Sequence, residues 1–130
     1  LMVRPLVENG LALFMRKLGV GYTNYFNTKY HRSGHLFQGR YKKKEIGSDE
    51  SLLHVSAYIH LNPVTAKIVS KPNDYRWSSY LYFIGESPDS IVSGKDSLFD
   101  ISEKEYQNLV DGLMKEGYFE NIASSIIEEQ

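Results

Sequence analysis

The stretch SAYIHLNPVTAK, Ser56–Lys67, decides how the middle of the chain folds. Its first half has helical character, but Pro63 lacks the backbone N–H that a continuing helix would use. We therefore expect a helix to end at Asn62 and a short second helix to begin at Pro63, with Asn62 as its N-cap. Tyr58 and Asn62 are one helical turn apart, so they share a face of that turn. By spacing alone, such a pair is typical of packing and capping.

Other helices are expected on both sides of this stretch. The polar pair Ser48-Asp49 predicts where the helix that reaches Asn62 begins. Upstream, apolar residues recur at helical spacing from Leu11 to about Tyr30. Downstream, Ser102–Glu105 forms a capping box that opens a helix, which Gly117 would close. A last helix is expected from about Phe119, where isoleucines recur at helical spacing.

The segment HRSGHLFQGRYKKKEI, residues 31–46, lacks this helical pattern. Ser33-Gly34 and Gly39 punctuate it, and residues between such breaks favour short extended segments. The sequence therefore predicts some β structure between the first two helices.

Composition excludes several classes of protein. The chain has 130 residues, enough for one modest domain, and its aromatic content of 13% is too high for a disordered chain. There is no cysteine, which excludes disulfides and thiolate metal sites. No apolar run approaches the roughly 20 residues of a membrane span, and no signal peptide opens the sequence. We expect a cytoplasmic protein, and the initial Leu1 suggests a piece of a longer one.

Charge is divided unevenly along the chain. Up to Lys44 there are nine basic residues and one acid, a net charge of +8. From Glu45 onward there are six basic residues and 15 acids, a net charge of −9. A basic block with interleaved tyrosines is typical of a surface that binds nucleic acid, although charge clusters are also found on merely solvated faces.

Tyr58 could also act as a nucleophile. A phenol has a pKa of about 10, so about one in a thousand is ionised at neutral pH, and it needs a base or a metal-activated electrophile. The amide oxygen of Asn62, beside Tyr58, suits Mg²⁺ or Mn²⁺. His54 is one turn before Tyr58 and could orient its hydroxyl, whereas His60 faces elsewhere. The histidines, which also include His31 and His35, form no compact zinc motif.

Three runs together resemble the single-tyrosine HUH transposases, specifically the REP-associated tyrosine transposases. They are YHRSGHLFQGRYKKKEI (residues 30–46), LLHVSAYIHLNPVTAKIV (52–69) and PNDYRWSSYLYFIG (72–85). The resemblance implies that Tyr58 attacks single-stranded DNA and forms a 5′-phosphotyrosine. It also implies that Asn62 is one ligand of a divalent ion, Mg²⁺ or Mn²⁺. The implied fold is a ferredoxin-like antiparallel sheet with helices on one side.

One element of the family pattern is missing. The His-hydrophobic-His pair that holds the metal should lie just before the first long helix. Leu1–Pro5 resembles the continuation of that strand, immediately after the second histidine, so the pair itself is absent from this sequence. We therefore expect an α+β chain that is mostly helical with a small sheet: a partial transposase domain over residues 1–85 and an acidic helical extension over 86–130. Without the histidines, this chain should hold no metal tightly and should not cleave DNA by itself.

The expected partner is single-stranded or hairpin DNA, and we expect a homodimer. Phe37, Tyr41 or Trp77 could stack on unpaired bases, although Trp77 and Phe37 are more typical of a core. Two alternatives to the enzyme remain, a DNA-hairpin-binding module without chemistry and a structural or dimerising module that uses the acidic tail. The residues expected to contact DNA are Arg32, His35, Gln38, Arg40, Lys42, Lys43, Lys44 and Arg76.

Overall fold

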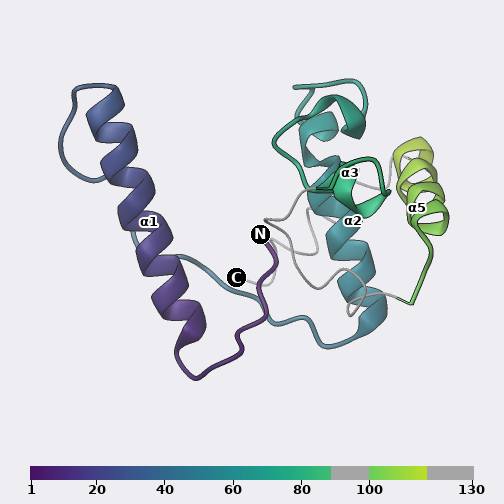
Figure 1. The fold of residues 1–130 in the computed structure, drawn as a ribbon, viewed down its shortest axis with the longest axis horizontal. Coiled ribbons are helices and arrows are strands. Elements are labelled where there is room, and N and C mark those ends of the chain that lie inside the picture. Colours follow the sequence, from purple (N-terminus) through teal and green to yellow (C-terminus); the bar gives the residue numbers. More distant parts are fainter. Residues whose placement is uncertain (89–99, 117–130) are drawn as a thin grey trace. The chain divides into compact units, whose positions relative to one another are not determined.

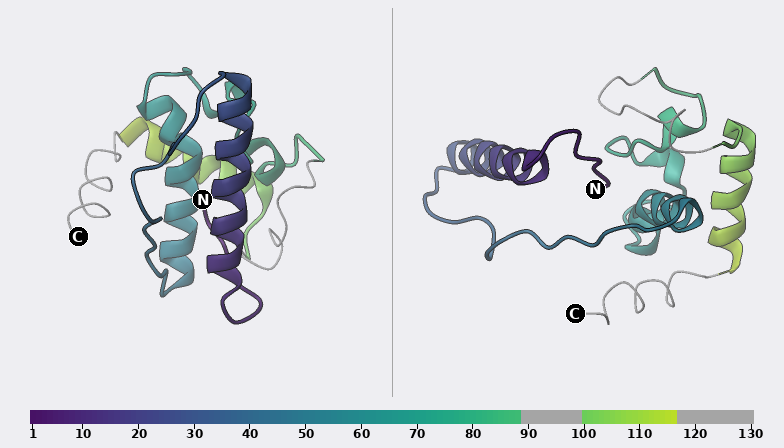
Figure 2. Two further views of the ribbon diagram at one scale, coloured as in Figure 1. Left: turned by 90° about the vertical axis from the view of Figure 1, so that its left-hand side faces the viewer. Right: turned by 90° about the horizontal axis from the view of Figure 1, so that it is seen from below.

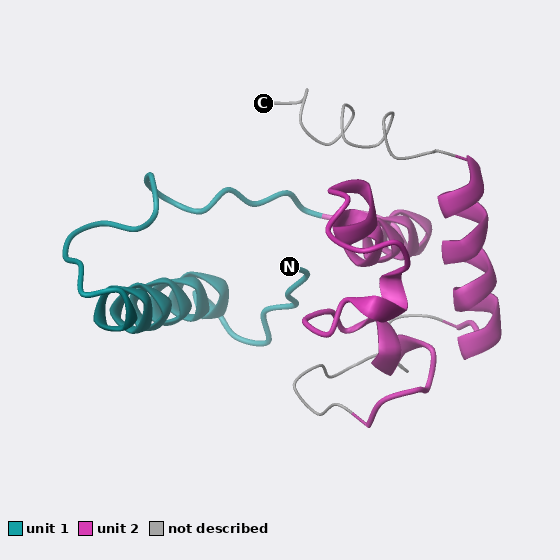
Figure 3. Ribbon diagram, turned by 90° about the horizontal axis from the view of Figure 1, so that it is seen from above, with its two compact units in different colours: residues 1–45 teal, residues 46–130 magenta. Residues whose placement is uncertain are grey.

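A computed structural model describes residues 1–88 and 100–116 of the chain (Figure 1). Its elements, in order, are α1 (Gly10–Lys29), α2 (Asp49–Thr65), the short 3₁₀ helix η1 (Pro72–Asp74), α3 (Tyr80–Phe83) and α5 (Glu103–Glu116). Contacts divide the chain into two units, unit 1 (Leu1–Glu45) and unit 2 (Ile46–Gln130), which Figure 3 colours separately. The functional division at residue 85 stays a prediction.

The expected α+β fold is wrong. No residue in the ranges 1–88 and 100–116 belongs to a strand, so these residues form no ferredoxin-like sheet. The segment 31–46, expected to be extended, consists of a turn, bends and irregular backbone. An extended segment becomes a strand only when a neighbouring strand pairs with its N–H and C=O groups, and glycine punctuation says nothing about whether such a partner exists.

Helix α1 forms where its apolar spacing predicts, but it has no buried residue. Leu13, Phe14 and Leu18 are each more than 40% exposed. No residue of unit 1 is buried, so this unit has no core of its own. Its apolar and aromatic side chains lie at the surface.

Helix α2 begins as predicted and ends later than predicted. Ser48 is its N-cap, and its hydroxyl oxygen accepts a hydrogen bond of 3.2 Å from the backbone N–H of Ser51. The predicted end at Asn62 is wrong, because the helix continues through Pro63 to Thr65. Proline in the last turn removes only one intrahelical bond. Beyond it, the Ala66 N–H still donates to the Asn62 carbonyl at 2.9 Å.

The core of unit 2 joins α2, α3 and α5. Helix α5 packs crosswise against α2 (Figure 2), and η1 contacts both α2 and α3. The acidic part of the chain therefore contributes directly to the core that contains α2. The buried apolar residues are Ala57, Leu61, Tyr80, Phe83, Ile84, Tyr106, Val110 and Leu113.

The predicted capping box at the start of α5 is confirmed. Ser102 Oγ accepts from the Glu105 N–H at 3.2 Å, and the Glu105 carboxylate accepts from the Ser102 N–H at 2.7 Å. The same carboxylate accepts a 2.6 Å bond from the Ser102 hydroxyl, and these bonds hold the pKa of Glu105 below its usual value. The expected closure at Gly117 and the helix from Phe119 lie outside the described residues.

A glycine turn brings the end of α3 close to the start of α5. Gly85 has a φ of +75°, in the left-handed region that favours glycine. A Cβ atom at this position would collide with the carboxylate of Glu103. Any larger residue at position 85 would therefore strain the turn, and the Glu103 side chain would have to move aside.

Candidate catalytic tyrosine and nucleic-acid surface

Tyr58 and Asn62 lie on the side of α2 that faces away from the core. The buried polar and apolar residues of the helix include Ser56, Ala57, His60 and Leu61. At about 100° per residue, Tyr58 and Asn62 point about 150° away from the middle of this buried face. Asn62 is exposed and Tyr58 is half-buried. Both residues belong to α2, so the predicted pair lies one turn apart on the side of the helix that faces away from the core.

A buried hydrogen-bond network fixes the opposite face of α2. His60 Nδ1 lies 2.7 Å from the Tyr106 hydroxyl of α5, and His60 Nε2 lies 2.8 Å from the Ser79 hydroxyl before α3. Ser56 Oγ lies 2.7 Å from the same Tyr106 oxygen. The sequence indicated that His60 faces away from Tyr58, but its role as the centre of this network was missed. Its one-turn spacing from Ser56 on the core side was the available signal.

Burial keeps this network uncharged near neutral pH. It lowers the pKa of His60 to about 4, because the imidazolium is unfavourable away from water. Burial also raises the pKa of the Tyr106 hydroxyl, against the opposing effect of its bond with Ser56. A neutral imidazole has one donor and one acceptor nitrogen, and hydroxyls can serve as either partner. Both ring nitrogens are therefore satisfied in either tautomer.

Tyr80 packs beside the network without joining it. Its ring centroid lies 5.6 Å from that of His60, but its buried hydroxyl has no hydrogen-bond partner in the described part of the chain. Burial, with smaller contributions from Asp111 and Glu86, raises the pKa of Tyr80 to about 12. A buried hydroxyl without a partner reduces stability. Tyr80 is therefore a local weakness in the core of unit 2.

The residues around Tyr58 do not form a complete metal site. Within residues 1–88 and 100–116, no group of three His, Cys, Asp or Glu residues could hold a metal ion. Asn62 offers one neutral oxygen, whereas a hard divalent ion takes about six oxygen ligands, usually with at least one carboxylate. The donor set in these ranges does not fit Mg²⁺ or Mn²⁺.

Most of the predicted DNA contacts lie in unit 1. Arg32, His35, Gln38, Arg40 and the run Lys42–Lys44 are all exposed. A guanidinium N–H of Arg32 donates to the His35 carbonyl at 3.4 Å, within the loop that follows α1. The remaining predicted contact, Arg76, is exposed but belongs to unit 2.

The three proposed stacking residues are exposed. Trp77 is 75% exposed and Phe37 is 55% exposed, so the interpretation of these two residues as core is wrong. Tyr41 is 41% exposed. The guanidinium of Arg76 lies 4.3 Å from the centre of the Trp77 ring, which pairs a cation with an open aromatic face.

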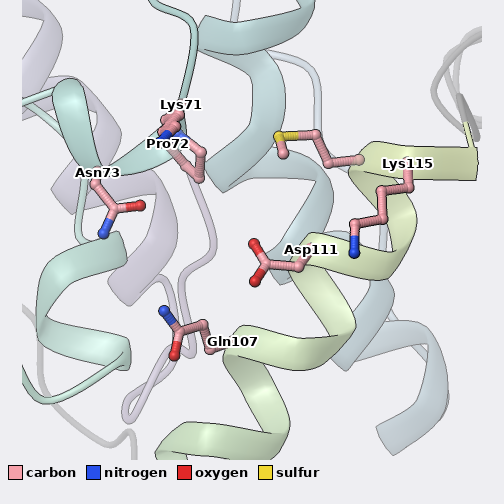
Figure 4. A pocket seen from close by; sticks show the side chains of 7 residues that line it. Lys71, Pro72, Asn73, Gln107, Asp111 and Lys115 are labelled. Carbon is pink, nitrogen blue, oxygen red and sulfur yellow. The ribbon is translucent and has the colours of Figure 1, made fainter.

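A hollow of about 320 Å³ lies between η1 and α5 (Figure 4). Lys71 and Asn73 line one side, and Gln107, Asp111 and Lys115 line the other. None of the predicted catalytic or DNA-contacting residues lines it.

No protein family, curated protein or solved structure matches this chain. The resemblance to REP-associated tyrosine transposases therefore stays a prediction. No helix in the described ranges combines the length and the apolar character needed to cross a membrane.

Proposed function

We propose that this chain is the DNA-binding and nucleophile-bearing part of a single-tyrosine DNA transposase. The observation that carries the proposal is that charge and structure divide at the same place. Unit 1 has nine basic residues and two acids, a net charge of +7, and unit 2 has six basic residues and 14 acids, a net charge of −8. A compact basic segment with exposed aromatic rings suits a single-stranded polyanion.

In this proposal Tyr58 cleaves the strand that unit 1 binds. The Tyr58 hydroxyl oxygen forms a bond to a backbone phosphorus while the bond from phosphorus to the 3′-oxygen breaks. The phenol proton passes to a base, and the departing 3′-oxygen takes up a proton. The products are a 5′-phosphotyrosine and a free 3′-hydroxyl. The 3′-hydroxyl end of a second strand can later attack the phosphotyrosine, which reverses the step. The position of Tyr58, half-buried on the side of α2 that faces away from the core, supports this role.

Asn62 has the role that the resemblance implies, a ligand of a divalent ion in the intact enzyme. The described residues do not complete that ligand set. Because Asn62 supplies a single neutral ligand, the proposal is that this chain by itself binds DNA without cleaving it. The proposal includes the cytoplasmic location and the homodimer that are expected from the sequence.

Salt dependence tests the DNA-binding part of the proposal. With about four phosphates neutralised, the logarithm of the binding constant for a single-stranded oligonucleotide should fall with the logarithm of salt at a slope of about −3. Replacing Lys42, Lys43 and Lys44 together with Ala should flatten that slope, as measured by fluorescence anisotropy.

A matched variant distinguishes the effect of the Lys42–Lys44 surface from the effect of net charge alone. Lys67, Lys71 and Lys104 are exposed lysines of unit 2, and replacing all three with Ala changes the net charge by the same amount. Their replacement should leave the slope nearly unchanged. Undetectable binding at low salt, or equal effects of the two triple variants, would contradict the proposed DNA surface.

A further inference from the structure

Five aromatic side chains of unit 1 lie against one another in one cluster, here called the aromatic ladder. It consists of Tyr22, Tyr25 and Phe26 on α1, Tyr30 at the C-cap of that helix and Phe37 in the loop that follows. The ring centroid of Tyr22 lies 6.3 Å from Tyr25, 6.2 Å from Phe26 and 6.2 Å from Phe37. Those of Phe26 and Tyr30 are 4.5 Å apart. The rings therefore form one continuous surface along the C-terminal half of α1.

The aromatic ladder is open to solvent. Tyr22, Tyr25, Tyr30 and Phe37 are each between 48% and 57% exposed. Large aromatic residues are mostly buried in folded proteins, and a cluster of exposed rings marks a binding surface. The exposure of four neighbouring aromatic rings is therefore unusual for a folded protein.

Two cations lie among the rings. Lys29 Nζ donates to the Tyr25 hydroxyl at 3.2 Å and lies 5.6 Å and 5.5 Å from the ring centres of Tyr25 and Tyr30. The Arg32 guanidinium lies 5.7 Å from the ring centre of Phe26. The hydrogen bond with Tyr25 raises the pKa of Lys29, so its positive charge is secure. The surface therefore offers flat rings and positive charge together.

We propose that the aromatic ladder stacks on unpaired bases of single-stranded DNA, while Lys29 and Arg32 contact the neighbouring phosphates. The inference rests on the proposed function and goes beyond it, because it explains why the DNA must be single-stranded. Phosphate contacts alone do not distinguish paired from unpaired strands, whereas stacking requires an open base face. A second copy of unit 1 is a poorer occupant, because it would bring a charge of +7 against +7.

Oligonucleotides with and without bases test the inference directly. The full chain should bind a 20-nucleotide oligothymidine more tightly than an abasic strand of the same length, by about tenfold for each stacked base. A duplex of equal length should compete no better per phosphate than the abasic strand, because its base faces are already stacked. Anisotropy at one fixed salt concentration measures all three affinities.

Variants test whether the aromatic ladder causes the preference for oligothymidine over the abasic strand. Replacing Tyr22, Tyr25 and Tyr30 together with Leu removes three π faces but keeps apolar bulk, and Leu favours helix more than Tyr does. This variant should lose the preference for oligothymidine over the abasic strand while keeping the salt slope. Phe14→Leu, on the same helix but outside the ladder, should keep both. Circular dichroism confirms that the helix is retained in each variant.

The outcomes separate this inference from the proposed function. Equal affinity of the wild-type chain for oligothymidine and the abasic strand would overturn the ladder's role and leave DNA binding intact. Binding to neither would overturn both. A triple-Leu variant that keeps the preference, or that changes only the sedimentation behaviour of the protein, would assign the ladder to packing or to contacts between copies.

Discussion

Acidification should destabilise unit 2 through one residue, His60. The side chain is 3% exposed, and burial lowers its pKa from the usual 6.5 to about 4. Between these two pH values the unfolded chain binds a proton at this residue and the folded chain does not. Proton uptake therefore favours unfolding. The contribution of neutral His60 is complete above pH 6.5 and is lost as the pH falls to about 4.

The expected effect is large relative to the stability of a small domain. A pKa difference of 6.5 against about 4 corresponds to about 3 kcal/mol of unfolding free energy at low pH. Domains of this kind are stable by about 5 to 15 kcal/mol. With a urea dependence of about 1 to 1.5 kcal/mol per molar, the unfolding midpoint should fall by about 2 to 3 M through this residue alone.

Urea titrations at pH 7.5 and pH 4, followed by circular dichroism, measure the effect. Acid also protonates carboxylates, so the informative quantity is the difference between wild type and His60→Gln. The variant should be less stable at pH 7.5, because it disturbs the bonds to Tyr106 and Ser79, but it should lose about 3 kcal/mol less on acidification. His35→Gln, at an exposed position of unit 1, should behave like wild type. Equal acid losses in wild type and His60→Gln would refute the reasoning.

Three further predictions concern tyrosines. Tyr106→Phe removes the hydroxyl shared by His60 and Ser56 and should lower the unfolding free energy by about 1 to 3 kcal/mol in urea titrations. Tyr80→Phe removes a buried hydroxyl that has no partner within residues 1–88 and 100–116, so the same assay should show unchanged or slightly raised stability. This chain should form no covalent adduct with a labelled hairpin oligonucleotide in Mg²⁺ or Mn²⁺, since Asn62 supplies a single neutral ligand. With a His-hydrophobic-His pair added before Leu1, a denaturing gel should show an adduct. Tyr58→Phe should abolish it, and an adduct that survives would exclude Tyr58 as the nucleophile.

Local signals in the sequence predicted local structure well. The start of α2 at Ser48 and the capping box at Ser102–Glu105 each depend on hydrogen bonds between residues three positions apart. The apolar spacing from Leu11 predicted α1 within one residue at each end. These features could be predicted from the sequence because the interacting groups are close together along the chain.

Features that depend on distant partners could not be predicted in the same way. The extended segments expected within residues 31–46 would need pairing strands that a local pattern does not reveal. The expectation that Pro63 ends the helix was wrong. A proline in the last turn removes only one intrahelical hydrogen bond, and the Pro63 side chain is buried. His60 and Tyr106 are 46 positions apart, so their bond is invisible to any short window.

The distant bond between His60 and Tyr106 nevertheless bears on the residues that the sequence did identify. A helix can present Tyr58 and Asn62 outward only if its rotation about its own axis is fixed, and apolar contacts alone tolerate small rotations. Directional bonds from His60 to Ser79 and Tyr106, on the opposite face, constrain that rotation. Since Tyr106 belongs to α5, the acidic segment contributes to the placement of the proposed nucleophile. Loss of α5 should therefore affect the presentation of Tyr58 as well as the stability of unit 2.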